Sequence, residues 1–141
     1  MTSLLKKADF KAYWERALSF SKALDTLYTE YSKNNDIKTG YAMYDIIFHM
    51  IEFYARALLL KTCGIMEGKH KIVFEKFKEK FCSKDRFKTE LVDFYEKIMT
   101  KKDAIEYQFE PFDKETFEET KEYAKQFEKR AELLRGNTEW Q

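Results

Sequence analysis

Four polar side chains line one side of an otherwise apolar stretch, residues 41–60, that contains no glycine or proline. They are Asp45, His49, Glu52 and Arg56, and their steps of four, three and four residues keep them on one face of a helix. Carboxylate, imidazole and guanidinium groups can pair with one another or bind a charged ligand. The chemistry of this polar line therefore depends on whether it is wetted or enclosed.

Two interpretations of the polar line are open. In the first it faces water, with a contact between Asp45 and His49. Glu52 and Arg56 would then pair in the favourable order, and each pair would contribute roughly a few tenths of a kcal/mol. In the second the line borders a pocket or a dimer groove, because an unpaired polar group is costly to bury.

Residues 68–71, Gly-Lys-His-Lys, place the second histidine between two lysines at the expected start of a helix. Exposed amides at a helix N-terminus, together with lysines, can hold a phosphate group. The alternative is that His70 caps the helix locally while Lys69 and Lys71 stay solvated. Polar residues are common at helix starts, which favours the cap.

Other kinds of catalytic or metal site find little support in the sequence. Glu67-x-x-His70 has the spacing of a di-iron ligand pair, but such sites need one pair on each of two helices. The other histidine, His49, follows Ile46 rather than a carboxylate at that spacing. The chain has neither a Gly-x-Ser-x-Gly elbow nor a glycine-rich phosphate loop. We expect no bound metal, no cofactor and no catalytic triad.

Composition and charge fit a single helical domain. The 141 residues suffice to bury a core, and only four glycines and one proline are present. The net charge of +1 does not indicate a class of binding partner. The charge is unevenly distributed, however, since residues 61–88 are rich in basic side chains and residues 106–122 in acidic ones. The basic segment could meet phosphate or the chain's own acidic segment.

The expected compartment follows from the cysteines and the N-terminus. The two cysteines lie 19 positions apart without a CxxC partner, so we expect reduced thiols in a cytoplasmic protein. The first residues lack the apolar core of a signal peptide. Residues 41–60 are long enough to cross a bilayer, but their four polar side chains would be costly there. We therefore expect no membrane partner.

Apolar periodicity predicts an all-α fold with four long helices and one short helix. The long helices are expected over about residues 9–33, 39–60, 85–99 with a weak continuation to 107, and 114–135, and the short one over 69–81. Gly64 suits a left-handed helix end, and Asp113 suits an N-cap. Phe112 and Phe117 fit a hydrophobic staple around that cap.

Short loops between long amphipathic helices predict an antiparallel, up-and-down four-helix bundle with one additional short helix. The apolar stretch at 41–60 should be its central helix, because a helix that is apolar nearly all round is a buried one. We expect a single domain over residues 1–141, with a loose tail at 137–141.

Three segments resemble the small HEPN (higher eukaryotes and prokaryotes nucleotide-binding) proteins. Residues 48–60, with Arg-Ala-Leu-Leu after an aromatic pair, are similar to the second helix of that family. Residues 68–73, followed by Phe77 and Phe81, are similar to its next element, in which a His begins a helix that ends in Phe. Residues 102–107, Lys-Asp-Ala-Ile-Glu-Tyr, resemble a family segment with Arg and then Ala-Asp-Tyr. The likeness runs from about residue 41 to residue 134.

The resemblance implies a helical bundle, usually a homodimer, often encoded or fused with a minimal nucleotidyltransferase. Some members are the substrate-binding partner of that enzyme, and others are RNA-cleaving toxins with Arg, four to six further residues, then His. Neither histidine here follows an arginine at that distance, and Arg56 lies 14 positions before His70. Lys102 stands where the family usually has Arg, which weakens an anion contact because lysine lacks the bidentate fork.

We therefore predict a non-catalytic HEPN-type module that binds a nucleotide or a nucleotidyltransferase partner, in a toxin–antitoxin-type pair. The expected ligand is a nucleotide or RNA and not DNA, and the chain is expected to form a homodimer. The candidate ligand-binding residues are Arg56, His70, Lys102, Tyr107, His49, Glu52 and Lys69. One alternative is a divergent, metal-independent HEPN endoribonuclease built around His70 and Arg56. Another is a helical self-association protein with no ligand.

Overall fold

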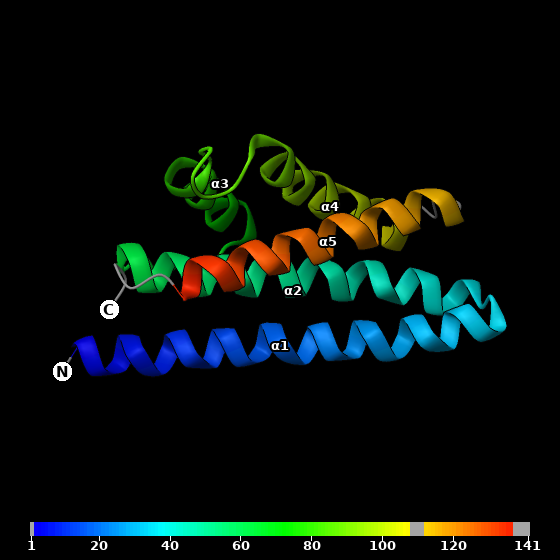
Figure 1. Cartoon of the computed structure of the whole chain (residues 1–141), viewed down its shortest axis with the longest axis horizontal. Helices are drawn as coiled ribbons and strands as arrows, with labels where there is room; N and C mark the ends of the chain where they lie inside the picture. The colour runs from blue at the N-terminus through cyan, green and yellow to red at the C-terminus, as the bar shows by residue number, and fades with distance from the viewer. Residues whose placement is uncertain (1, 108–111, 137–141) are drawn as a thin grey trace.

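The computed structural model describes the backbone of residues 2–107 and 112–136, and the side chains of residues 10–36, 38–101 and 112–136. Every regular element in these ranges is an α-helix, which confirms the all-helical prediction (Figure 1). The five helices are α1 (Thr2–Asn34), α2 (Ile37–Cys63), α3 (His70–Phe81), α4 (Thr89–Tyr107) and α5 (Lys114–Arg135). Across the described residues, none of these helices is both long and apolar enough to cross a membrane.

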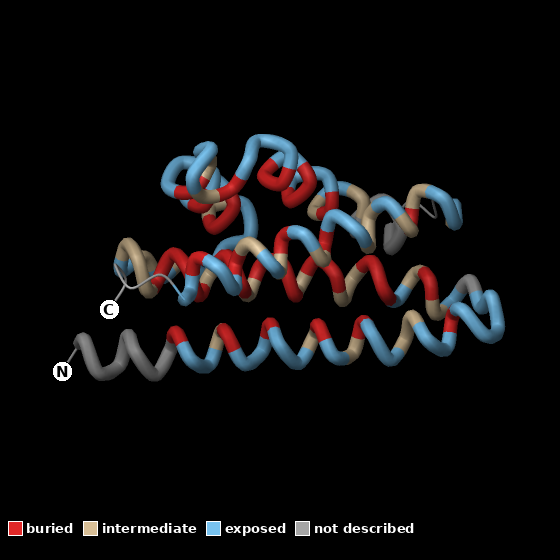
Figure 2. The backbone as a smooth tube through the Cα atoms, in the orientation of Figure 1, coloured by how far each residue is buried: buried red, intermediate tan, exposed pale blue. Residues whose placement is uncertain are grey.

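The helices pack as a bundle around α2, as its nearly continuous apolar surface predicts. Figure 1 shows α1 running alongside α2, with α3, α4 and α5 on the other side. α2 contacts all four of the other helices. Figure 2 shows buried positions on α1 only along one edge, whereas α2 is buried along most of its length. The polar line of α2 is therefore the exception on a helix that the rest of the chain covers.

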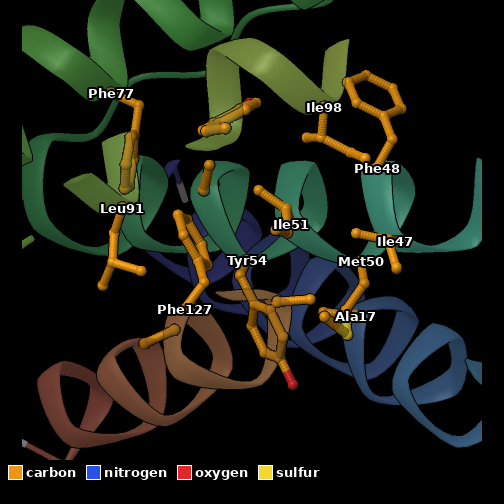
Figure 3. Close-up of a cluster of buried hydrophobic side chains, with 14 of the residues drawn as sticks. Ala17, Ile47, Phe48, Met50, Ile51, Tyr54, Phe77, Leu91, Ile98 and Phe127 are labelled. Atoms are coloured by element: carbon orange, nitrogen blue, oxygen red, sulfur yellow. The ribbon is translucent and has the colours of Figure 1, made fainter. Parts of the chain in front are cut away.

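Side chains from all five helices meet in one core (Figure 3). Its aromatic centre joins α3, the α3–α4 connection and α5 through three fully buried phenylalanines, Phe77, Phe87 and Phe127. The ring centroid of Phe87 lies 4.9 Å from that of Phe77 and 4.6 Å from that of Phe127. Close aromatic packing of this kind fixes the short helix α3 against the rest of the bundle.

Both ends of α2 follow local rules. The carboxylate of Asp36 accepts a hydrogen bond from the amide of Lys38 at 3.0 Å, so the helix starts two residues before the predicted residue 39. At the other end Gly64 adopts φ 67°, and its amide donates back to the carbonyl of Leu60 at 3.0 Å. This is the predicted left-handed ending. α2 is one uninterrupted helix across the whole polar line.

Two predicted helix starts were wrong. The backbone of α1 is helical from Thr2 rather than from about residue 9, which fits a segment without glycine or proline. α4 starts at Thr89 rather than at 85, because residues 82–87 form a turn. In that turn the amide of Ser83 donates to the carbonyl of Phe87 at 3.0 Å, and Arg130 of α5 donates to the carbonyls of Asp85 and Arg86.

The start of α5 matches its prediction. Asp113 accepts a hydrogen bond from the amide of Thr116 at 3.2 Å, and the ring centroids of Phe112 and Phe117 lie 5.6 Å apart as a hydrophobic staple. The hydroxyl of Tyr41 accepts a hydrogen bond from the amide of Phe112 at 3.0 Å, which ties this start to α2. The predicted loose tail at 137–141 lies outside the described residues.

Candidate functional site

The polar line of α2 divides into an outer and an inner half. In the outer half, Nε2 of His49 lies 3.5 Å from a carboxylate oxygen of Asp45, and both side chains are about one-third exposed, at 31% and 38%. The His49 ring also stacks on Phe20 of α1, with ring centroids 5.3 Å apart. This half is the wetted pair of the first interpretation, placed at the edge between α1 and α2.

The inner half is enclosed, as in the second interpretation. Only 3% of the Glu52 side chain and 11% of the Arg56 side chain are exposed. Oε2 of Glu52 lies 3.4 Å from Nη2 of Arg56, which is the predicted pair, and 2.6 Å from Nδ1 of His70 in α3. A single buried carboxylate oxygen thus joins two helices that are separated in sequence by a loop.

Arg56 holds that loop in place. Its Nη1 donates to the backbone carbonyl of Glu67, and its Nη2 donates to the carbonyl of Gly68 at 3.2 Å. Three oxygens, two of them from the backbone, therefore surround the guanidinium. In this arrangement Arg56 positions the start of α3 over Glu52.

His70 does not cap α3, so the favoured expectation of a local cap was wrong. The N-cap position is Lys69, and no side chain there bonds the first-turn amides. His70 lies three residues before the buried Val73 and four before the buried Phe74, so its ring faces α2 rather than its own helix end. The edge of the ring also packs on Phe48 of α2, with centroids 5.4 Å apart.

The imidazole of His70 has an inner and an outer nitrogen. Nδ1 faces Glu52, while 58% of the side chain remains exposed. A ring held in this way can accept a proton at Nε2 when neutral, or donate a hydrogen bond from Nε2 to an anion when protonated. Lys69 and Lys71, on either side, are exposed.

Two buried polar atoms beside this cluster have no hydrogen-bond partner among the described residues. They are Oε1 of Glu52 and the hydroxyl of Tyr95 in α4. Burial raises the pKa of Tyr95 well above its usual value, the negative charge of Glu52 raises it further, and Arg56 opposes the shift. Tyr95 is thus part of the electrostatic environment of Glu52. Its sequence context indicated only an inward-facing core residue, so no local pattern identified Tyr95 as a neighbour of the site.

The predicted site residues are only partly brought together. Glu52, Arg56 and His70 form one cluster, with Lys69 next to it, whereas His49 pairs with Asp45 instead. The side chains of Lys102 and Tyr107 lie outside the described residues, although the backbone of both belongs to α4. In the described part of the chain, no group of three or more His, Cys, Asp or Glu could hold a metal ion.

Comparisons with protein-family models, with curated proteins and with solved structures each found no match to the chain. The resemblance to HEPN proteins therefore stays a prediction from the sequence. What can be argued about function comes from the geometry around Glu52 and His70.

Proposed function

We propose that the chain is a non-catalytic, HEPN-type module that binds a nucleotide, or serves as the partner of a minimal nucleotidyltransferase in a toxin–antitoxin-type pair. The observation that carries the proposal is the 2.6 Å contact between the buried Glu52 carboxylate and Nδ1 of His70, at a helix start without a side-chain cap. This contact fixes a partly exposed imidazole where the first amides of α3 and two lysines can face the same phosphate.

Three physical effects support phosphate binding at this place. The N-terminus of a helix carries a partial positive charge and amides without helical partners. Lys69 and Lys71 add two full charges, and Nε2 of His70 adds a donor when the ring is protonated. Arg56 and Glu52 act as positioning residues in this proposal, because the contacts that they make hold the loop and the ring rather than facing outward.

The finer fold expectation belongs to the same proposal. We assign α1, α2, α4 and α5 to an antiparallel four-helix bundle, with α3 as the additional short helix that carries the site. The module is proposed to be a cytoplasmic homodimer. Sedimentation velocity of the full chain tests the dimer, and a monomer at all concentrations would contradict it.

Calorimetric titration with the four nucleoside triphosphates, alone and with a co-encoded nucleotidyltransferase, tests the binding proposal. His70→Ala should weaken binding by at least about tenfold, the effect of losing a charge-assisted hydrogen bond. His49→Ala is the matched control. Because His49 pairs with Asp45 instead, this substitution should leave the affinity unchanged. No binding of any triphosphate in either format would refute the proposal.

A second candidate function, a divergent metal-independent endoribonuclease, is favoured by one specific observation. A carboxylate that orients an imidazole through Nδ1 leaves Nε2 to take a proton from a ribose 2′-hydroxyl. Single-stranded RNA incubated with the chain in the presence of a chelator separates the two functions. The enzyme requires cleavage that Glu52→Gln and His70→Ala abolish and His49→Ala preserves, and intact RNA with the unaltered chain excludes it.

A further inference from the structure

A groove of about 700 Å³ lies between α4 and α5, and all of its described lining residues belong to those two helices. Its apolar lining comes from three side chains, Phe94 and Ile98 of α4 and Tyr123 of α5. The rings of Phe94 and Tyr123 stack with centroids 5.5 Å apart and bridge the two helices. Tyr123 is 38% exposed, so its ring is not part of the buried core. Phe94 and Ile98 are themselves buried, at 7% and 1% exposed, so the aromatic surface that the groove presents to the outside comes chiefly from Tyr123.

Carboxylates line the rim of this groove. Glu90, Asp93 and Glu96 lie along the first two turns of α4, and Glu119 lines the groove from α5. All four side chains are exposed, and none makes an ion pair with any other described residue. Lys97 and Lys101 also line the groove further along α4, so four carboxylates face two lysines along its described lining.

The shape of the lining indicates the kind of ligand. The lining residues of α4 run from Glu90 to Lys101, which spans about 16 Å, or three turns of a helix. An apolar floor with a charged rim of that length matches the helix-in-groove mode of recognition, in which apolar side chains at helical spacing fill the groove. Unpaired carboxylates on the rim select a partner of opposite charge and speed its approach.

We propose that the α4–α5 groove docks a cationic amphipathic helix of a partner protein, about three turns long. The apolar face of that helix lies on Phe94 and Tyr123, and its lysines or arginines lie over Glu90, Asp93 and Glu96. The stems of such side chains cover aromatic surface while their charged ends reach the carboxylates. The proposal is independent of the His70 site, which is built from α2 and α3.

The probe is a fluorescent peptide of about 18 residues, made of leucine and lysine with the leucines on one helical face, a length that can be helical by itself. Fluorescence anisotropy with the full chain should show saturable binding that added salt weakens. The same peptide with glutamate in place of lysine should not bind. If the lysine peptide does not bind either, the proposal is overturned.

Two matched pairs of variants locate the binding. Asp93→Lys with Glu119→Lys should weaken binding by more than about tenfold, because like charges then face each other. Glu15→Lys with Glu30→Lys makes the same change in net charge on exposed positions of α1 and should leave the affinity within about twofold. Equal weakening by both pairs would show attraction to net charge alone and would overturn the groove.

The apolar floor is tested in the same assay. Tyr123→Ser should weaken binding by about tenfold, whereas Leu133→Ser, at a 62% exposed position of α5 outside the groove, should not. Equal affinities for the two variants overturn the floor contact.

Sedimentation tests whether a second copy of the chain occupies the groove instead of a partner protein. If the chain self-associates and Asp93→Lys with Glu119→Lys abolishes the self-association, the ligand is a second copy and the proposed partner helix is overturned. His70→Ala should bind the peptide normally, which separates this result from the nucleotide proposal.

Discussion

Glu52 carries a carboxylate at a position where only 3% of the side chain is exposed, and it is placed between Arg56 and His70. A buried charge is tolerated when it is paired and hydrogen-bonded, and both conditions hold for Oε2. Among the described residues, Oε1 of Glu52 and the nearby hydroxyl of Tyr95 have no hydrogen-bond partner. Buried polar groups normally find hydrogen-bond partners. The pairing of Oε2 with two groups, beside an unpaired Oε1, is therefore unusual for a carboxylate whose role is only to stabilise the fold.

Two buried tyrosines should respond in opposite ways to the loss of a hydroxyl group. The hydroxyl of Tyr54 donates to Oε2 of Glu128 at 2.6 Å, while Lys125 lies 3.7 Å from Oε1. Tyr54→Phe therefore removes the hydrogen bond to Oε2 and should lower the free energy of unfolding by about 1–2 kcal/mol. Tyr95→Phe removes an unpaired hydroxyl while keeping the ring, so the free energy of unfolding should stay the same or rise.

Urea unfolding followed by circular dichroism measures both variants on the same scale. The two tyrosines serve as controls for each other, since each substitution removes one oxygen and no packing carbon. A clear loss of stability in Tyr95→Phe would mean that its hydroxyl has a partner, and the incomplete pairing around Glu52 would have to be abandoned.

The loop between α2 and α3 is the element that brings His70 against Glu52 and so forms the candidate site. Its residues 65–69 carry no helix, and their position relies on a left-handed glycine at one end and on the guanidinium of Arg56 in the middle. If the loop moved, Nδ1 of His70 would leave Glu52 and the start of α3 would leave α2.

Arg56→Lys should loosen this loop while keeping the charge. A lysine ammonium cannot reproduce the planar fork that reaches Glu52 and the two loop carbonyls together. We expect the free energy of unfolding to fall by about 1–2 kcal/mol, and hydrogen exchange of the amides at 65–70 to accelerate. Unchanged exchange in this segment would contradict the positioning role of Arg56.

Two glycines at the ends of this loop form a matched pair. Gly64→Ala places a Cβ on a backbone with φ 67°, which should destabilise the protein by about 1–2 kcal/mol. Gly68→Ala adds a Cβ with no atom within 4 Å, so its thermal midpoint should match the unaltered chain or exceed it slightly. Thermal unfolding compares the two directly, and equal midpoints would show that the helix end is not set by Gly64.

The sequence predicts these elements well where the physics is local. The periodicity of α2, its end at Gly64, the N-cap Asp113 and the Asp45–His49 pair all depend on residues a few positions apart, and all are confirmed. The start of α4 was missed because Arg130, far along the chain, stabilises the preceding turn. The contact between His70 and Glu52 was missed for the same reason, since the loop that brings the two side chains together is held by backbone carbonyls.

At the scale of the whole molecule, the two proposed binding surfaces lie on different helices, the His70 site on α2 and α3 and the groove on α4 and α5. α2 contacts every other helix, and its inner polar half is covered by the start of α3 and by Tyr95 of α4. The acidic groove lies between α4 and α5, which contact each other less extensively than either α1 and α2 or α2 and α5. The two proposed ligands, a small anion at the start of α3 and a cationic helix at α4–α5, would therefore not compete for the same residues.

The buried tyrosines should also make the stability of the whole molecule fall at alkaline pH. Burial, followed by nearby carboxylates, raises the pKa of Tyr54 and Tyr95 above the usual value, and the pKa values of Tyr28 and Tyr31 are raised as well. The unfolded chain releases these protons near pH 10, whereas the folded chain keeps them. The contribution of these tyrosines to the free energy of unfolding is therefore complete below about pH 10. It is lost as the pH rises above that, by about 1.4 kcal/mol per pH unit for each strongly shifted tyrosine.

Urea unfolding between about pH 8 and about pH 11.5 should show this fall in the free energy of unfolding with pH, and Tyr95→Phe should reduce the slope by the contribution of one tyrosine. A slope that is the same in the variant, or a stability that rises with pH, would contradict the buried position of Tyr95 beside Glu52.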